Sequence, residues 1–403
     1  MEQSPLSQQN NITSLARQTK VYIVIGVALA LVLGAVIGKW YVGKTYGIPG
    51  YVADIPKHGL DLRTKEKRIF VLNGRELWSY ALGNARWTMV DKGLSLTGTA
   101  LGESIIEGVG PMVAYVSNAG ARKELMVSDV HGNKLRIFEL EGGAEESYDI
   151  FLNEWSPNNL QLLFAVAMDT GGIGQNSFIL SARAAEIDRG FYVADLNGGK
   201  IYKLAVGAEE GQPWESLGWL DNNTILFSKG DALFSYSLRL GRPVPFEKQL
   251  FPQGKKPFAF RKSKVSERGT FSYETGELGD NPNSQIYFFD GEAYRLVKDG
   301  GWAENQFSLI SPDGSLIAYS RFLTENTFNQ KAEIHIYHVK DGKDEVLPFE
   351  FATSFMSYYW WNNTRLVVKE PGSELAFLSV YDVINKKQEL IVKKPADEGA
   401  VAP

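Results

Sequence analysis

The chain has 403 residues, with 40 glycines, 12% aromatic residues and no cysteine. A formal net charge of −5 argues against a protein-wide basic surface for nucleic acid. The lack of cysteine excludes disulfides, thiol nucleophiles, iron–sulfur clusters and cysteine-ligated zinc. Abundant glycine and aromatic residues favour short strands joined by tight turns over a helical bundle.

A charge-free apolar segment covers residues 21–38, after a short polar tail at 1–20. As a helix this segment would span roughly 27 Å, close to the hydrocarbon thickness of a bilayer. Tyr22 lies at one end of it, and Trp40 with Tyr41 lies at the other, where interfacial aromatic residues are common. We therefore expect an uncleaved transmembrane helix, with a cleaved signal peptide as the alternative.

The cations on the two sides of this segment are nearly balanced, so the positive-inside rule gives little direction. A short tail before a long folded domain is typical of a signal anchor. We therefore expect a single-pass cell-membrane protein whose C-terminal domain lies outside the cytoplasm. Small residues at every fourth position would also allow helix–helix packing and oligomerisation. These residues are Gly26, Ala30, Gly34 and Gly38.

Residues 39–68 read as a juxtamembrane linker, because glycine and proline recur along them. The linker ends in a basic run formed by Arg63, Lys65, Lys67 and Arg68. Such a run is usually a solvated segment, although it is also suited to anionic headgroups or a charged wall polymer.

From residue 69 onward, short apolar runs replace any long helical periodicity. In several of them a bulky residue precedes a tight turn and then a strand, as in Trp155-Ser-Pro-Asn-Asn and Ile310-Ser-Pro-Asp-Gly. Proline, aspartate and glycine suit successive positions of such a turn. Related turns follow Trp219 and Trp360. We expect Trp155 and Trp219 to pack between neighbouring units.

Each of these strands is followed by a hairpin, as in 191–204 and 334–347. About seven such units fill residues 69–392, which gives roughly 46 residues per unit, the size of a propeller blade. The sequence therefore predicts an all-β fold, a β-propeller of seven blades with six or eight as alternatives. We expect the ring to close by strand pairing between its first and last units, and residues 393–403 to form a flexible tail.

The Ser-Pro turns at 156–157 and 311–312, each leading to a hairpin, resemble the repeats of TolB-like propellers. They are also similar to units of the N-terminal propeller of dipeptidyl-peptidase-IV-type enzymes. The WD dipeptide of WD40 repeats is absent. The resemblance implies an envelope-associated interaction domain and implies no catalytic residue.

No nucleophile elbow, P-loop, dinucleotide-binding fingerprint or EF-hand loop occurs in the sequence. We therefore predict no cofactor, no metal and no catalytic residue. His335 and His338 alternate along a predicted strand, so they should point to opposite sides and not chelate a metal together.

Two loops are candidate binding sites. The first is a long insertion at 168–190 that contains Arg183 and Glu186. The second is a basic segment at 255–264, which we expect to be exposed and either solvated or able to hold an anionic ligand. Its cations are Lys255, Lys256, Arg261, Lys262 and Lys264.

We expect a membrane-anchored, extracytoplasmic propeller that binds a protein partner or an anionic envelope polymer. The main alternative is an enzyme, such as a lyase or glycoside hydrolase, with its site in the central channel. A structural subunit of a surface assembly is a third possibility. Nucleic acid is not an expected partner.

Overall fold

The computed structural model describes residues 50–94, 98–99, 102–103, 106, 108–119, 122–141, 148–168, 190–206, 214–230, 232–250, 261–276, 284–299, 305–322, 332–351, 357–370 and 377–393. Every regular element in these residues is a β-strand. Within them, no helix has the length and hydropathy needed to cross a membrane. The predicted membrane helix at 21–38 and the polar tail at 1–20 lie outside these residues, as does the C-terminal tail beyond Lys393.

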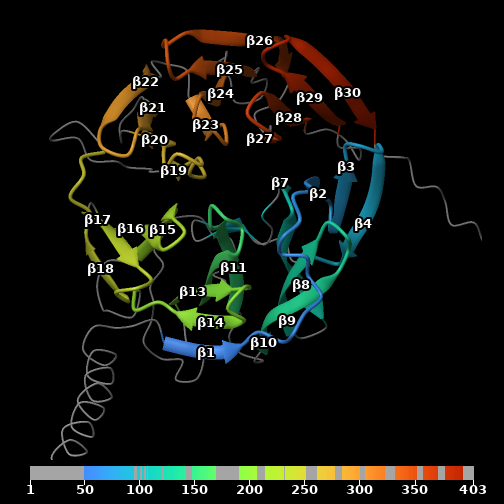
Figure 1. Ribbon diagram of the computed structural model, residues 1–403, viewed down its shortest axis with the longest axis vertical. Helices are drawn as coiled ribbons and strands as arrows, with labels where there is room; N and C mark the ends of the chain where they lie inside the picture. Colours follow the sequence, from blue (N-terminus) through green and yellow to red (C-terminus); the bar gives the residue numbers. More distant parts are fainter. Residues whose placement is uncertain are drawn as a thin grey trace, which may run out of the picture. The chain divides into compact units, whose positions relative to one another are not determined.

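The described strands form seven antiparallel sheets arranged around a centre, which confirms the prediction of an all-β, seven-bladed propeller (Figure 1). Blade 1 comprises β2 (Arg68–Asn73), β3 (Glu76–Ala81), β4 (Arg86–Lys92) and β7 (Gly108–Gly110). Blade 2 comprises β8 (Met112–Ala119), β9 (Arg122–Asp129) and β10 (Lys134–Glu141). Blade 3 comprises β11 (Tyr148–Trp155), β12 (Gln161–Met168), β13 (Gly190–Asp195) and β14 (Lys200–Lys203). Strand β1 (Gly50–Asp54) extends this sheet beside β14, and β6 (Gly102–Glu103) and β5 (Gly98–Thr99) extend it beside β11.

The remaining blades each have four strands in chain order, the first of which is innermost. Blade 4 comprises β15 (Trp214–Asp221), β16 (Thr224–Lys229), β17 (Ala232–Ser237) and β18 (Arg242–Pro245). Blade 5 comprises β19 (Arg261–Lys262), β20 (Phe271–Gly276), β21 (Ser284–Phe289) and β22 (Tyr294–Asp299). Blade 6 comprises β23 (Asn305–Ile310), β24 (Leu316–Phe322), β25 (Ala332–His338) and β26 (Asp344–Phe351). Blade 7 comprises β27 (Ser357–Trp360), β28 (Arg365–Glu370), β29 (Phe377–Asp382) and β30 (Lys387–Lys393).

The middle strands of the blades read as unbroken apolar runs because both of their faces are covered. On β12, Leu162 and Phe164 pack into the cluster shared with blade 2, whereas Leu163 packs into the cluster shared with blade 4. All three side chains are buried. Trp155 and Trp219 are buried in these same two clusters, so the prediction that both pack between blades is confirmed.

Because neighbouring strands are antiparallel, the turn between the first and second strands of a blade lies on the same side of the ring as the turn between the third and fourth. We call this side the turn face. It carries the Ser-Pro turns at 156–160 and 311–315. The hairpin turn at 130–133 of blade 2 also lies there, because the Val130 amide donates a hydrogen bond to the backbone oxygen of Pro111, next to the end of β7. The start of β2 also lies there, because Arg68 pairs with Gly110 at the end of β7.

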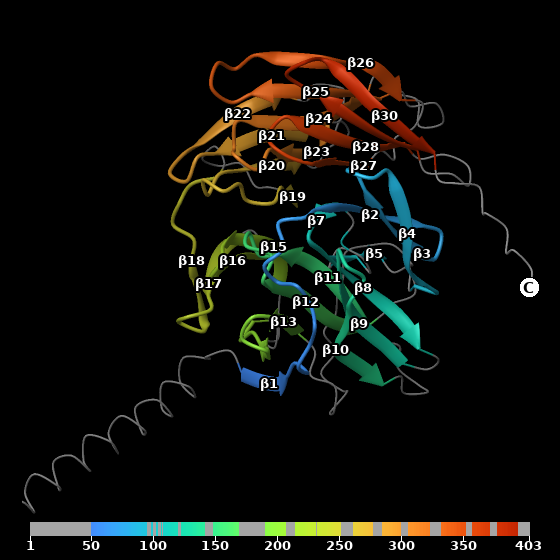
Figure 2. The ribbon, with the colours of Figure 1, turned by 45° about the vertical axis from the view of Figure 1, so that its right-hand side comes forward.

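The end of the predicted juxtamembrane linker is built into the propeller. Strand β1 pairs antiparallel with β14 at the outer edge of blade 3 (Figure 2). Residues 55–67, which we call the strap, then run along the turn face to the start of blade 1. Ile55 and Leu60 of the strap are buried in the cluster between blades 2 and 3.

Blades 1 and 7 share no strand among the described residues, so the prediction that the ring closes by strand pairing is wrong for this part of the chain. Closure depends instead on side chains, in a cluster that joins Ile69 and Val71 of blade 1 to Val367 and Val380 of blade 7. In addition, Lys369 Nζ donates a hydrogen bond to the backbone oxygen of Leu72 at 3.2 Å. Apolar packing therefore holds the first and last blades together.

This closure predicts that Ile69→Ala will lower the free energy of unfolding by about 2–4 kcal/mol, because it leaves a cavity at a fully buried site of the seam. Urea denaturation followed by tryptophan fluorescence measures the loss. Leu296→Ala is the matched control, since Leu296 is an exposed apolar residue of β22 and its removal should change stability by about 0.5 kcal/mol or less. Equal losses in the two variants would contradict closure by packing.

Candidate functional site

Two pairs of neighbouring blades are joined at the turn face by the same hydrogen bonds. From blade 3 to blade 4, the Asn158 amide donates to Asn222 Oδ1 at 2.9 Å. From blade 6 to blade 7, the Asp313 amide donates to Asn363 Oδ1 at 3.1 Å. In both pairs the donor belongs to a Ser-Pro turn and the acceptor belongs to the asparagine turn of the next blade. The repeated motifs thus hold neighbouring blades in register.

A tryptophan strengthens each of these two junctions. Trp219 Nε1 donates to the backbone oxygen of Glu154 at 3.1 Å, and Trp360 Nε1 donates to the backbone oxygen of Leu309 at 3.0 Å. Glu154 and Leu309 occupy equivalent positions, each two residues before the serine of a Ser-Pro turn. The two indoles therefore link blades as well as fill the core.

The Ser-Pro turns are held by their own side chains. Ser311 Oγ donates to Asp313 Oδ1 at 2.8 Å and accepts from the Leu316 amide at 2.9 Å. Burial would raise the pKa of Asp313, but hydrogen bonds from Ser315 and Ser311 lower it below its ordinary value. A rigid turn of this kind presents its backbone amide to the next blade in a fixed direction.

A buried ion pair lies where the innermost strands of blades 3, 4 and 5 meet. Lys262 Nζ on β19 is 3.6 Å from Glu154 Oε2 on β11, and the Lys262 side chain has no exposed surface. The same carboxylate oxygen accepts the Trp219 amide of β15 at 2.8 Å. Burial lowers the pKa of Lys262, and the charge and hydrogen bond of Glu154 oppose that shift. One carboxylate therefore contacts two other blades.

This arrangement requires glycine at position 218. The φ of Gly218 is +98°, a conformation that other residues rarely adopt, and a Cβ there would lie 2.2 Å from Glu154 Oε2. The glycine lets the carboxylate approach the backbone of blade 4 closely.

We expect Glu154→Gln to destabilise the protein by roughly 3 kcal/mol, because it leaves the buried Lys262 ammonium without a counter-charge. Adding Lys262→Met should recover part of that loss, so the double variant loses less than the sum of the single variants. Chemical denaturation of the four proteins measures this coupling.

Glu124→Gln serves as the control for this cycle. It removes the carboxylate of the more exposed Arg136–Glu124 pair, whose atoms are 2.9 Å apart, and should cost less than about 1 kcal/mol. Additive losses at positions 154 and 262 would contradict the proposed pairing.

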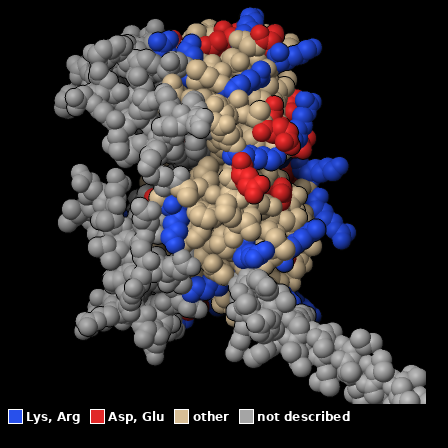
Figure 3. All heavy atoms as spheres, turned by 90° about the vertical axis from the view of Figure 1, so that its left-hand side faces the viewer, with Lys and Arg blue, Asp and Glu red and all other residues tan. Residues whose placement is uncertain are grey.

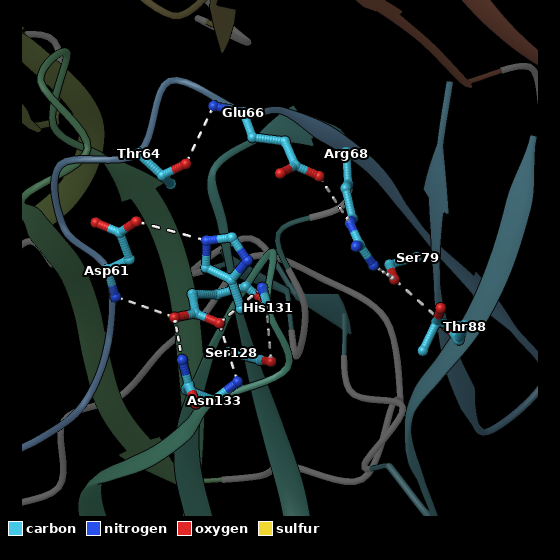
Figure 4. Close-up of polar contacts among 10 residues, drawn as sticks. Asp61, Thr64, Glu66, Arg68, Ser79, Thr88, Ser128, His131 and Asn133 are labelled. Carbon is cyan, nitrogen blue, oxygen red and sulfur yellow. Dashed lines mark hydrogen bonds and ion pairs between the residues drawn. The ribbon is translucent and has the colours of Figure 1, made fainter. Parts of the chain in front are cut away.

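The strap is fixed to blade 2 by Asp129, whose partners Asp61, His131 and Asn133 are labelled in Figure 4. Asp129 Oδ2 accepts the Asp61 amide at 3.0 Å and Asn133 Nδ2 at 2.9 Å, and Oδ1 accepts the His131 and Asn133 amides at 2.9 Å each. His131 Nε2 also lies 3.5 Å from Asp61 Oδ2. Burial would raise the pKa of Asp129, but these hydrogen bonds lower it below its ordinary value.

The structure gives the five cations of the predicted basic segment different environments. Lys255 and Lys256 lie outside the described residues. The same holds for the candidate residues of the long insertion, Arg183 and Glu186. It holds also for the small residues of the predicted membrane helix, which are Gly26, Ala30, Gly34 and Gly38. Arg261 belongs to β19. The expectation of an exposed loop is wrong for Lys262, which is buried against Glu154, whereas Lys264 is exposed.

Lys264 reaches a blade that is not its neighbour. It lies in the turn between β19 and β20 of blade 5, and its Nζ donates to Asn159 Oδ1 of blade 3 at 2.7 Å. Although Lys264 has exposed surface, desolvation of its ammonium by the surrounding residues lowers its pKa; Glu154 opposes this shift, and repulsion from Lys67 and Lys262 adds to it. Lys264 thus links blade 5 to blade 3 at the turn face.

The outer rim differs from this region. Figure 3 shows the side of the ring that carries blades 4 and 5, where Lys and Arg side chains lie among Asp and Glu side chains. Ion pairs there include Lys248–Glu292 and Lys298–Asp344, each at 3.2 Å. This side of the rim is therefore a surface of mixed charge.

The two histidines of β25 face different blades, as the strand pattern predicted. His335 stacks on Tyr319, which packs in the cluster shared with blade 5, whereas the even-numbered Ile334 and Ile336 pack against blade 7. His335 is buried, with Nδ1 3.2 Å from Asp344 and Nε2 2.8 Å from Glu333 Oε1. In the described ranges, no group of three or more His, Asp or Glu side chains is placed to hold a metal ion.

Asp344 joins blade 6 to blade 5. Its Oδ2 accepts from the Tyr319 hydroxyl at 2.7 Å and from Lys298 Nζ of blade 5 at 3.2 Å. Burial would raise the pKa of Asp344, but His335, Tyr319 and Lys298 lower it to about 2. The folded state therefore favours the ionised carboxylate.

Because the pKa of Asp344 is lowered from 3.8, its stabilising effect is present above pH 4 and disappears as the pH falls toward 2. We expect Asp344→Asn to lower the free energy of unfolding at pH 7 by about 2 kcal/mol and to flatten its decline between pH 4 and 2. Denaturation at a series of pH values measures both effects. An unchanged slope in the variant would contradict this assignment.

Neither a family model nor a curated protein matches the sequence. Solved structures with a similar fold include TolB from Acinetobacter baumannii, which is 14% identical over 81% of this chain and 78% of that chain, with a TM-score of 0.45. The β-propeller domain of the Trilobed protease from Pyrococcus furiosus is 13% identical over 86% of this chain and 96% of that chain, with a TM-score of 0.46. An oligogalacturonate lyase in complex with manganese is 12% identical over 70% of this chain and 84% of that chain, with a TM-score of 0.37.

These similarities concern the fold alone. They include both kinds of propeller that the sequence repeats resemble, TolB and a protease propeller.

Proposed function

We propose that this protein is a membrane-anchored, extracytoplasmic propeller that binds a partner and is not an enzyme. The turn face is the proposed binding surface. The observation that carries the proposal is that cross-blade hydrogen bonds fix this face, at the Asn158–Asn222 and Asp313–Asn363 junctions and through the Asp61–Asp129 contact of the strap. A rigid scaffold that displays turns is well suited to recognition.

The environment of the buried ionisable groups supports binding over catalysis. Glu154 is engaged by Lys262 and the Trp219 amide, and Asp129 is engaged by four donors of the strap and its own turn. His335 lies between Asp344 and Glu333. Glu154 joins three blades and Asp129 joins the strap to blade 2, whereas His335 links strands within blade 6, so all three have structural contacts.

The exposed cations of the strap support a negatively charged partner. Lys57, Arg63, Lys65 and Lys67 are exposed there, whereas the whole chain carries a net charge of −5. A local positive surface on an acidic protein favours an acidic protein or an anionic envelope polymer, through complementary charge and faster association. The predicted helix at 21–38 would hold this surface at the membrane.

A single cross-linking experiment on intact spheroplasts tests both parts of the proposal. The tagged full chain is treated with a membrane-impermeant cross-linker, solubilised in detergent and purified. Labelling of the chain itself reports that the propeller lies outside the cytoplasm, and captured partners report binding. We expect Arg63→Glu with Lys65→Glu to abolish capture, because it reverses two exposed cations of the strap.

Arg86→Glu with Lys92→Glu is the matched control, since it reverses one Arg and one Lys that are exposed on β4. This variant should capture the same partners as the wild type. Absence of labelling would contradict the sidedness. Equal capture by the strap variant and the control would contradict binding through the turn face.

A further inference from the structure

Blade 2 differs from the other blades because its described sheet is one strand short. It consists of β8, β9 and β10, whereas each of the other six described sheets has four strands or more. Strand β10 therefore forms the outer edge of the blade (Figure 1), and among the described residues it pairs with β9 alone. An unpaired strand edge exposes a row of backbone N–H and C=O groups that can pair with another strand.

The two faces of β10 differ in character. Leu135, Ile137 and Leu140 are buried in the cluster between blades 2 and 3, so they fix the strand to the ring. The opposite face carries Arg136, whose side chain is 52% exposed, and Glu139, whose side chain is 24% exposed. A β-bulge at Ile137 brings these two residues, three apart in the sequence, onto the same face, where they form an ion pair at 2.7 Å. The exposed face of β10 thus has a cation before the bulge and an acid after it.

The sequence of β10 is complementary to itself in the antiparallel orientation. A two-fold axis between positions 137 and 138 places position 136 of each copy opposite position 139 of the other. Arg136 then lies opposite Glu139 of the second copy, and Leu135 lies opposite Leu140. The ends of the strand match as well, since position 134 is a lysine and position 141 is a glutamate. Parallel pairing in register would instead place each charge against its own kind.

The ion pairs within one chain leave these side chains able to bind a second copy. Arg136 uses Nη1 for both Glu124 and Glu139, at 2.9 and 2.7 Å. A guanidinium has N–H donors on three nitrogens, and Nε and Nη2 of Arg136 have no partner among the described residues. Arg122 Nη1 lies 2.7 Å from Glu139 Oε1, and a carboxylate can accept more than two hydrogen bonds. Pairing of two copies therefore adds contacts without breaking those already present.

We infer that the outer edge of β10 is a homodimer interface, in which two copies of this chain pair their blade 2 sheets antiparallel across a two-fold axis. Each copy supplies the strand that the other lacks, so two three-stranded sheets form one continuous sheet. Backbone groups along both edges gain partners, and the opposite charges set the register. The inference goes beyond the proposed partner binding at the turn face and stands without it.

An exchange of charges tests the interface, with sedimentation velocity of the detergent-solubilised full chain at a series of concentrations as the measurement. We expect a reversible dimer of the wild type. Arg136→Glu and Glu139→Arg each place like charges opposite one another at both ends of the interface, so each should raise the dissociation constant at least about tenfold. An equimolar mixture of the two variants should dimerise again, because every contact between positions 136 and 139 then joins opposite charges.

Arg86→Glu is the matched control, since it reverses an exposed arginine of β4, the outer strand of blade 1. Its dissociation constant should stay within about twofold of the wild-type value. Circular dichroism checks that each variant is folded. A wild type that stays monomeric at every concentration would overturn the inference, and so would a mixture that stays monomeric. Equal dimerisation of the wild type and Arg136→Glu would also overturn it, because association through the predicted membrane helices alone gives that result.

Discussion

The carboxylate of Glu154 connects three blades, and much of the ring's geometry near its centre depends on it. It belongs to blade 3, accepts the Trp219 amide of blade 4 and pairs with the buried Lys262 of blade 5. Two other features lie directly against this carboxylate. The left-handed Gly218 leaves room for the carboxylate, and the short strand β19 can keep a fully buried lysine because its charge is opposed.

Fixing Lys262 has a consequence for Lys264, two residues later. With Lys262 directed to Glu154, the chain enters the turn in which Lys264 contacts Asn159 of blade 3. Blades 3 and 5 are therefore joined once by a buried ion pair and once by an exposed hydrogen bond. A single acidic side chain, that of Glu154, thus supports both the packing of the ring and the position of Lys264 at the turn face.

The propeller could be predicted from sequence because its signals are local. Ser-Pro turns, hairpin turns and apolar runs recur at a regular spacing, and each depends only on neighbouring residues. The equivalence of Trp219 and Trp360 was visible as a repeated tryptophan before an asparagine turn. That pattern could also have indicated the Asn222 and Asn363 junctions, since the asparagines recur at the same place.

The candidate site could not be predicted because its contacts are long-range. Nothing near Lys262 in the sequence indicates that Glu154, 108 positions earlier, opposes its charge. Nothing near Lys264 in the sequence indicates that its ammonium contacts Asn159, 105 positions earlier. Among the described residues, closure depends on apolar packing between blades at opposite ends of the chain, which no local pattern indicates.

The pairing of β1 with β14 determines the order in which the chain can fold during synthesis. Gly50–Asp54 leaves the ribosome early, but its partner Lys200–Lys203 follows about 150 residues later. Strand β1 therefore cannot pair with β14 until blade 3 has been translated. The strap that follows β1 forms its hydrogen bond from the Asp61 amide to Asp129 only after blade 2 has been translated. Blade 3 is thus the point at which the N-terminal part of the propeller becomes committed to its final arrangement.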